Sequence, residues 1–347
     1  MQRSYLPIVP TSALRRHRVH EPFDTRFRSA ARLLQSVWRT ARGLPLGTYA
    51  RPNGTTLRLG SMISDKAGEA GRNFLLPEIA RLARREVAYR EPGALIEERR
   101  LWCNLLSSMP LTLNLFGPLK LDSKLATKML RAMFSDLSNA TVETVLFEHS
   151  PGRGAADLTA DHTAFDAMLI YTRPDNSRGF VAVETKYSET LGEPQRPLKP
   201  RYVELAPLAG LHMEPGADDL ISGPLQQLYR QHLLAQAILM RGDFSEGRFI
   251  VVAPQLNTSV QAGIAAYGSK LVRPSPAQVA FGSVTLEDMI DLLRQCGERG
   301  YAKMLFERYA DWSKVDEAIE TEIALLGSLA SAANDAATEA AAEAAAA

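Results

Sequence analysis

Residues 163–189 read "TAFDAMLIYT", "RPDNSRG" and "FVAVETKYSE", and this stretch decides the fold. The first and last segments are rich in β-branched and aromatic residues, whereas the middle one holds Pro, Asp, Asn, Ser and Gly. This pattern predicts two antiparallel strands, near 163–172 and 180–187, that a turn connects. If Asp166 pairs with Glu184, the hairpin is centred on Asp175, which lies inside the predicted turn. The hairpin therefore brings two carboxylates together beside Lys186.

The second strand carries its charges at one end of an otherwise apolar segment. Side chains alternate along a strand, so Glu184 and Lys186 share a face. Two converging carboxylates, such as Asp166 and Glu184, repel each other unless a divalent cation lies between them. Oxygen ligands suit Mg²⁺, with Mn²⁺ as an alternative, and a neighbouring lysine can activate water and stabilise an anionic transition state. These residues indicate phosphodiester hydrolysis, and the alternative is a salt-bridge trio on the surface of an edge hairpin.

The flanking sequence predicts helices around a small sheet. Further strands are expected at 141–149 and 247–255, which makes four in all. Helices are expected at 24–43, 71–90, from 94 through 109, at 123–137, 224–240, 285–296 and 300–325, with a loop or ribbon at 43–60 and a loop at 111–120. The Ala/Glu-rich end reads as a frayed helix or a disordered tail. This order predicts an α/β core with helical flanks.

The hairpin motif, placed between a helix and strand on one side and a helix on the other, resembles the PD-(D/E)XK nuclease superfamily, in particular its bacterial restriction-endonuclease-like members. Supporting stretches are "NLLSSMPLTLNLFGPL" at 104–119 and "FEHSPGR" at 147–153. The resemblance covers about 25–310. It implies a four-stranded mixed sheet flanked by helices, here with an N-terminal helical extension, and Mg²⁺-dependent DNA cleavage. It also implies that Asp166 and Glu184 bind metal, that the Thr185 carbonyl is a possible third ligand, and that Lys186 activates water.

Other acidic residues are candidates for the same site. The superfamily often takes a further carboxylate from the helix before the sheet, and Glu98 is the choice here because Leu101, Leu105 and Ser108 would share its helix face. Glu97 is a less favoured candidate, and a solvent-facing capping role is open for both. Glu148 and His149 stand at the end of the first expected strand, where an acid–histidine pair could touch metal or phosphate. A structural role for His149 is the alternative.

Three polar residues are candidates for contacts with DNA. Arg153 follows "HSPG", and Gln227 and Arg230 lie on the expected helix 224–240. Some superfamily members carry Gln and Tyr four residues apart on this helix. Here Gln226 and Tyr229 are three apart, so that feature does not carry over, and Arg230 can equally be a solvated helix residue.

Composition places the chain among ordinary globular proteins. Of its 347 residues 46% are hydrophobic and 23% charged, and the net charge is +1. Residues 1–100 carry 19 Lys and Arg against 9 Asp and Glu, a balance of +10, whereas residues 311–347 carry 1 against 8, a balance of −7. A basic region of this kind is expected to contact a phosphate backbone, although it can also pair with the acidic end. Two cysteines without metal spacing, and neither a secretory signal nor a membrane span, lead us to expect a cytoplasmic protein.

The sequence thus predicts a basic helical region over 1–93, a nuclease core over 94–310 and an acidic, Ala-rich end over 311–347. We expect a Mg²⁺-dependent DNA endonuclease, with a homodimer as a possible assembly because cutting both strands normally needs two sites. The alternatives are a catalytically silent nucleic-acid-binding or assembly protein with the same fold, and a hydrolase of another phosphate ester. Phosphate-binding loops, nucleophile elbows and Cys/His metal motifs are absent from the sequence.

Overall fold

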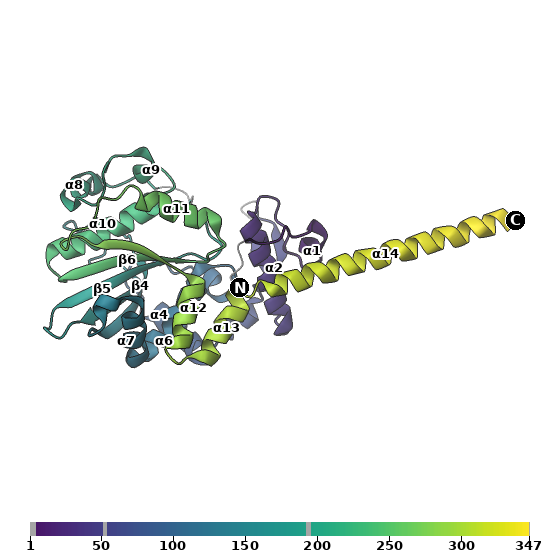
Figure 1. Ribbon diagram of the computed structural model, residues 1–347, viewed down its shortest axis with the longest axis horizontal. Coiled ribbons are helices and arrows are strands. Elements are labelled where there is room, and N and C mark those ends of the chain that lie inside the picture. Colours follow the sequence, from purple (N-terminus) through teal and green to yellow (C-terminus); the bar gives the residue numbers. More distant parts are fainter. Residues whose placement is uncertain (1–4, 51–53, 192–195, 347) are drawn as a thin grey trace.

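The computed structural model describes residues 5–50, 54–191 and 196–346, and a five-stranded sheet forms its centre (Figure 1). The strand order is β3-β4-β5-β6-β7, with antiparallel pairing from β3 to β5 and parallel pairing from β5 to β7. The strands are β3 (Thr141–His149), β4 (Phe165–Thr172), β5 (Arg178–Thr185), β6 (Glu246–Ala253) and β7 (Ala280–Thr285). The expected mixed sheet flanked by helices is confirmed. The expected number of four strands was wrong, because the short edge strand β7 is only partly buried and lacks a strong apolar pattern.

The β4–β5 hairpin has the expected register. Ala167 pairs with Val183 and Thr172 with Arg178, so the pairing is centred on Asp175. The Asp175 carboxylate accepts hydrogen bonds from the backbone N–H and the hydroxyl of Ser177, at 2.9 and 2.6 Å. This side-chain-to-backbone bond stabilises the tight turn. The position of the turn then determines which residues of β4 and β5 face each other.

Helices cover both faces of the sheet. On one face, Phe180 and Ala182 of β5 pack in a hydrophobic cluster; on the other face, Val181 and Val183 pack in a second one. The first cluster lies under α8 (Pro200–Ala209), α10 (Gln226–Arg241) and α11 (Thr258–Gly268), with the short α9 (Asp218–Ile221) nearby. The second lies under α6 (Ser108–Leu121), α7 (Ser123–Met133), α12 (Leu286–Gln295) and α13 (Arg299–Tyr309). Each fully buried Val or Phe contributes about 1.5–3 kcal/mol, so β5 is held from both sides.

The chain before the sheet forms two helices where one was expected. The expected helix from 94 through 109 is replaced by α5 (Glu98–Cys103) and the start of α6, and the expected loop at 111–120 lies inside α6. Pro110 occupies the first turn of α6, where a missing backbone N–H costs no helical hydrogen bond. The Ser107 hydroxyl caps this turn by accepting the N–H of Met109 at 3.2 Å. Pro110 therefore belongs to the start of a helix and does not mark an end.

The N-terminal region joins the same core. It consists of α1 (Thr11–Arg16), α2 (Arg26–Ala41), the antiparallel ribbon β1 (Leu46–Ala50) and β2 (Thr56–Ile63), α3 (Asp65–Glu69) and α4 (Pro77–Ala88). The expected helix at 71–90 begins later, at Pro77, because proline favours the first helical position. Leu34, Val181 and Val315 belong to one hydrophobic cluster, so the three expected segments share a core. The boundaries at 93/94 and 310/311 stay a prediction.

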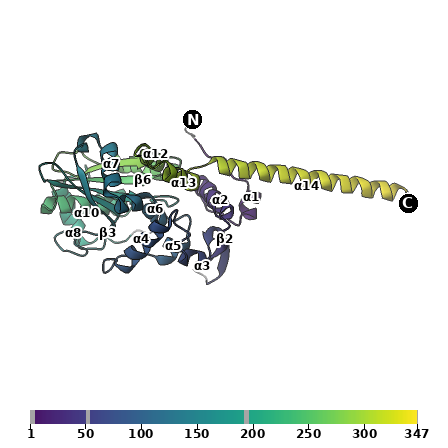
Figure 2. The ribbon, with the colours of Figure 1, turned by 90° about the horizontal axis from the view of Figure 1, so that it is seen from below.

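The C-terminal helix α14 (Ser313–Ala346) projects away from the body (Figures 1 and 2). Its first turns pack against α2, where Val315 is fully buried, and Glu322, 2% exposed, pairs with Arg16 of α1. Beyond this point Ile323 and Leu329 are 59% and 57% exposed. In the described part of the chain no helix is long and apolar enough to cross a bilayer.

Candidate active site

Three acidic residues lie opposite one another at one end of the sheet. The pairs Phe147–Ala167 and His149–Phe165 flank Glu148 and Asp166, so these two residues face each other across β3 and β4. The pair Ala167–Val183 is the neighbouring pair in the β4–β5 ladder. By the same register, Asp166 and Glu184 face each other across β4 and β5. The hairpin spacing therefore produces the row that the sequence predicted for Asp166 and Glu184, and the sheet adds Glu148 to it.

Burial and mutual repulsion act on these carboxyl groups. Burial, followed by the charges of Glu184 and Glu148, raises the pKa of Asp166 well above its ordinary value. Burial, followed by the charge of Glu184, raises the pKa of Glu148 to about 7. Asp166 Oδ2 accepts the backbone N–H of Thr185 at 2.7 Å, which holds its carboxylate against the end of β5. A nearby cation would relieve the repulsion in this row.

Glu184 and Lys186 form a buried pair that α10 covers. Lys186 Nζ lies 2.9 Å from Glu184 Oε1, and the two side chains are only 4% and 3% exposed. Gln227 bridges them: its Oε1 accepts from Lys186 Nζ at 2.7 Å, and its Nε2 donates to Glu184 Oε1 at 2.8 Å. Gln231 Nε2 donates to Glu184 Oε2 at 2.6 Å and to the carbonyl of Ala164 at 2.9 Å. Both oxygens of Glu184 thus have fixed partners.

The polar side of this helix, Gln231 included, is expected from the sequence to face DNA or the site, but the hydrogen bond from Gln231 to Glu184 was not foreseen. Gln227 and Gln231 are four residues apart and therefore share one helix face. Two glutamines on the buried face of an apolar helix are a signal that could have been read from the sequence. The other residues weighed on this helix, Gln226 and Tyr229, are occupied elsewhere: the Gln226 amide bonds to the backbone of Arg196, and the Tyr229 hydroxyl donates to the carbonyl of Pro215.

The donor set suits a hard divalent cation. Asp166, Glu184 and the Thr185 carbonyl offer oxygen ligands at one end of β5, and oxygen is what Mg²⁺ and Mn²⁺ prefer. Gln231 Oε1, on the α10 side of the row, is a buried oxygen without a hydrogen-bond partner. Among the described residues, however, no three His, Cys, Asp or Glu side chains are grouped as metal ligands. The fit therefore rests on two carboxylates with backbone and amide oxygens.

Glu98 does not lie in this row, which corrects its expected placement. Its side chain is 57% exposed and pairs with Arg90 at 3.4 Å. The expected shared face with Leu105 and Ser108 is lost because α5 ends at Cys103. Glu97 precedes the helix, where its carboxylate lies 3.9 Å from Arg100.

His149 and Arg153 converge on Glu91, a residue that the sequence did not single out. Glu91 Oε1 contacts His149 Nδ1, and Glu91 Oε2 accepts from Arg153 at 3.1 Å. Burial raises the pKa of Glu91, but its hydrogen bonds to His149, Ser150 and Arg153 outweigh this effect and lower it overall. Arg153 also donates to the carbonyl of Glu148 at 2.9 Å. The structure places Arg153 in a network that supports the Glu148 end of β3, and not on an open surface.

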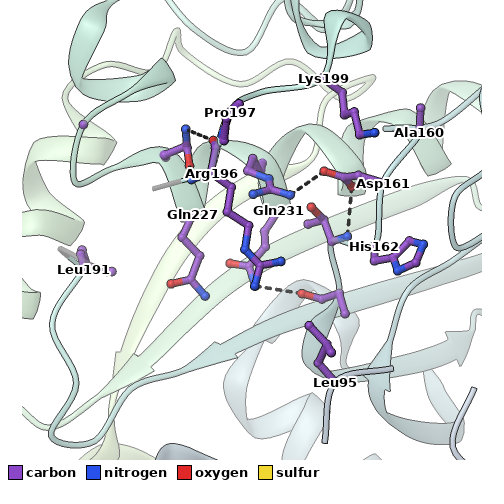
Figure 3. A pocket seen from close by; sticks show the side chains of 15 residues that line it. Leu95, Ala160, Asp161, His162, Leu191, Arg196, Pro197, Lys199, Gln227 and Gln231 are labelled. Atoms are coloured by element: carbon purple, nitrogen blue, oxygen red, sulfur yellow. Dashed lines mark hydrogen bonds and ion pairs between the residues drawn. The ribbon is translucent and has the colours of Figure 1, made fainter. Parts of the chain in front are cut away.

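Arg230 lines a cavity of about 670 Å³ beside α10 (Figure 3). Its guanidinium donates to Asp161 Oδ2 at 2.6 Å, and the Tyr202 hydroxyl donates to the same oxygen at 2.9 Å. Gln227 and Gln231, the partners of Glu184, line the cavity too. The cavity therefore adjoins the α10 side of the carboxylate row.

Comparison with known proteins gives one match. A family model described as the PD-(D/E)XK nuclease superfamily matches residues 22–311, which is most of the chain. No curated protein and no solved structure matches it.

Proposed function

The chain belongs to the PD-(D/E)XK nuclease superfamily, whose members are generally nucleases, and from this premise we propose that it is a Mg²⁺-dependent endonuclease acting on DNA. The observation that carries the proposal is the meeting of Asp166, Glu184 and Lys186 at one end of the sheet. Their burial also supports it, because charged groups rarely occupy a protein interior without a function that needs them.

Each residue has a distinct role in the proposed hydrolysis. Asp166, Glu184 and the Thr185 carbonyl would hold Mg²⁺, or Mn²⁺ in its place. The ion would supply Lewis-acid polarisation of the phosphate and charge neutralisation. Lys186 orients the attacking water and stabilises the negative charge that develops on the phosphate. Gln227 keeps Lys186 Nζ in place through its 2.7 Å contact, and burial excludes bulk water, which strengthens these interactions.

Plasmid cleavage tests the assignment. Purified protein is incubated with supercoiled plasmid and Mg²⁺, Mn²⁺ or EDTA, beside the variants Lys186→Ala and Asp166→Ala. We expect each variant to cut at least about 100-fold more slowly, the usual range for removal of a catalytic proton-transfer or charge-stabilising group. Glu98→Ala is the matched control, because this carboxylate is exposed and lies outside the row; it should cut at the wild-type rate.

Two outcomes would redirect the proposal. Wild-type cutting rates in both site variants would remove these residues from the chemistry. DNA binding by the wild-type protein, with no cutting of the plasmid or of a gapped or flap substrate in either metal, would favour the alternative, a catalytically silent nucleic-acid-binding protein. The possible homodimer and the cytoplasmic location stay predictions, which sedimentation and cell fractionation would test.

A further inference from the structure

The cavity beside α10 has one wall in common with the proposed active site. It lies between the segment before β4, the segment around 196–199 and the start of α10 (Figure 3). Gln227 and Gln231 line it, and the same two amides hold Glu184. A phosphodiester at the carboxylate row therefore has its neighbouring nucleotide within reach of this cavity.

The rim of the cavity is positively charged. Arg196 and Lys199 are both exposed, and within the described ranges neither side chain forms an ion pair. This sets them apart from Arg230, whose charge Asp161 balances. Uncompensated cations beside a site are what a phosphate backbone recognises, because binding releases the counterions around the nucleic acid.

The size of the cavity and the burial of the site restrict what can enter. A volume of about 670 Å³ is that of a small-molecule pocket of about 300–1,000 Å³. Its walls offer both apolar surface, from Leu191 and Pro197, and hydrogen-bonding groups. A base that stays stacked in a duplex does not enter such a pocket, whereas an unpaired or extruded base does.

We propose that this cavity receives an unpaired nucleotide next to the scissile bond, with Arg196 and Lys199 contacting its backbone phosphates. The inference deepens the proposed nuclease function and rests on it for the identity of the scissile bond. It assigns the substrate class as DNA that is single-stranded at the position of the cut, such as an overhang, a flap or a gap.

Binding to labelled oligonucleotides tests this inference without any cleavage. Fluorescence anisotropy in EDTA compares a 12-nucleotide single strand with a blunt duplex of the same sequence. We expect the wild-type protein to bind the single strand more tightly. We expect Arg196→Ala/Lys199→Ala to weaken single-strand binding about tenfold and to reduce the slope of log affinity against log salt by about 1.4, since each lost phosphate contact contributes about 0.7.

The matched control is Lys124→Ala/Arg299→Ala, which removes the same charges from exposed positions on α7 and α13, across the sheet from α10. It should bind the single strand as the wild-type protein does. A single strand with three abasic positions tests base entry, and we expect it to bind about tenfold more weakly than the intact strand, because a held base contributes about 1–3 kcal/mol. Equal binding of single strand and duplex, equal loss in both double variants, or no effect of the abasic positions would each overturn the inference.

The two proposals fail separately. If the plasmid and a gapped or flap substrate stay intact in Mg²⁺ and Mn²⁺ while the binding results are as expected, the nuclease function fails and the nucleotide pocket stands. If cleavage requires Lys186 and Asp166 but binding shows no preference for the single strand, the nuclease function stands and the pocket assignment fails.

Discussion

Gln227 is the residue on which the alignment of the catalytic pair depends. Its amide oxygen accepts from Lys186 Nζ and its amide nitrogen donates to Glu184 Oε1, so it bridges the two side chains. Gln227→Leu keeps the volume of the side chain but removes both hydrogen bonds. Loss of such a supporting partner typically reduces activity by about 10–100-fold.

We therefore predict that Gln227→Leu lowers kcat at saturating Mg²⁺ by about tenfold or more, with little change in KM for the oligonucleotide. Single-turnover cleavage separates the two quantities, and thermal unfolding checks that the fold is intact. Gln295→Leu, at an exposed position near the end of α12, is the control. An unchanged kcat in Gln227→Leu would remove it from the positioning role.

The sequence predicted the residues of the site that lie close together along the chain. It did not predict those that meet through contacts between distant segments. Asp166 and Glu184 are related by one hairpin, whose register follows from a turn that is visible in the sequence. Glu91, by contrast, meets His149 across 58 residues, and Gln231 meets Glu184 across 47. Glu98 was misplaced because the position of the break between α5 and α6 depends on capping, which an apolar pattern does not reveal.

At the scale of elements, α10 and α11 are joined through a buried histidine pair. The Tyr267 hydroxyl of α11 bonds to His232 Nδ1 of α10 and to His212 Nε2, each at 3.0 Å. Burial lowers the pKa of His212 to about 3 and that of His232 to about 4, from an ordinary value of 6.5. Both histidines are therefore neutral in the folded protein at neutral pH.

This pair predicts an acid-sensitive fold. Because the unfolded chain binds protons at about pH 6.5 and the folded chain does not, the stability from these groups is fully present above pH 6.5 and falls as the pH drops toward 4. The contribution of each histidine to the free energy of unfolding should fall by up to about 1.4 kcal/mol per pH unit. Urea unfolding between pH 7 and 4.5 measures the slope. His212→Phe should reduce it, and the exposed His162→Asn should leave it unchanged; an equal slope in all three proteins would contradict the assignment.

The elements themselves were largely predictable, whereas their joints were not. The strand at 141–149 was predicted with its observed bounds, and the helix at 224–240 agrees closely with α10, because both have strong periodic patterns. The expected helix at 300–325 is in fact α13 and α14, which meet around Trp312. A tertiary contact decides that joint: Trp312 packs against Phe27 of α2 at a ring-centroid distance of 5.4 Å.

At the scale of the whole molecule, the acidic C-terminal end and the basic N-terminal region meet where α14 contacts α1 and α2. Arg16 of α1 pairs with Glu322 of α14, and the helix then leaves the body. We predict that deletion of residues 328–347 changes the free energy of unfolding by no more than about 0.5 kcal/mol. Deletion of 313–347 should cost more than about 2 kcal/mol, because it also removes the buried Val315 and the Arg16 partner. Chemical denaturation of both truncations tests this, and equal losses would show that the projecting turns are part of the fold.

Part of the positive charge of the N-terminal region has no acidic partner among the described residues. Arg15, Arg18 and Arg58 line an open cavity with a volume of about 460 Å³. Within the described residues none of the three forms an ion pair. This is where the expected contact between the basic region and a phosphate backbone would occur. We predict that Arg15→Gln/Arg18→Gln/Arg58→Gln weakens duplex DNA binding for all sequences alike and lowers the salt slope by about 2.7, at about 0.9 per contact.

Anisotropy with a long duplex at several salt concentrations measures this slope. The control is Lys124→Gln/Lys128→Gln/Arg299→Gln, which removes an equal charge at exposed positions on α7 and α13. An equal decrease in both triple variants would mean that net charge alone, and not this surface, governs binding.

The register of the β4–β5 hairpin has a consequence for how this centre can vary. Asp166 and Glu184 face each other because pairing is counted symmetrically from Asp175. Adding the same number of residues to each arm, or a longer loop at the tip, leaves the two carboxylates opposed, whereas a single residue added within one strand turns one of them to the other face of the sheet. The interval of seventeen residues is therefore a property of this hairpin's length and not of its chemistry. A search for proteins that share this centre should therefore require that the two carboxylates lie opposite each other across a hairpin. It should not require a particular number of residues between them.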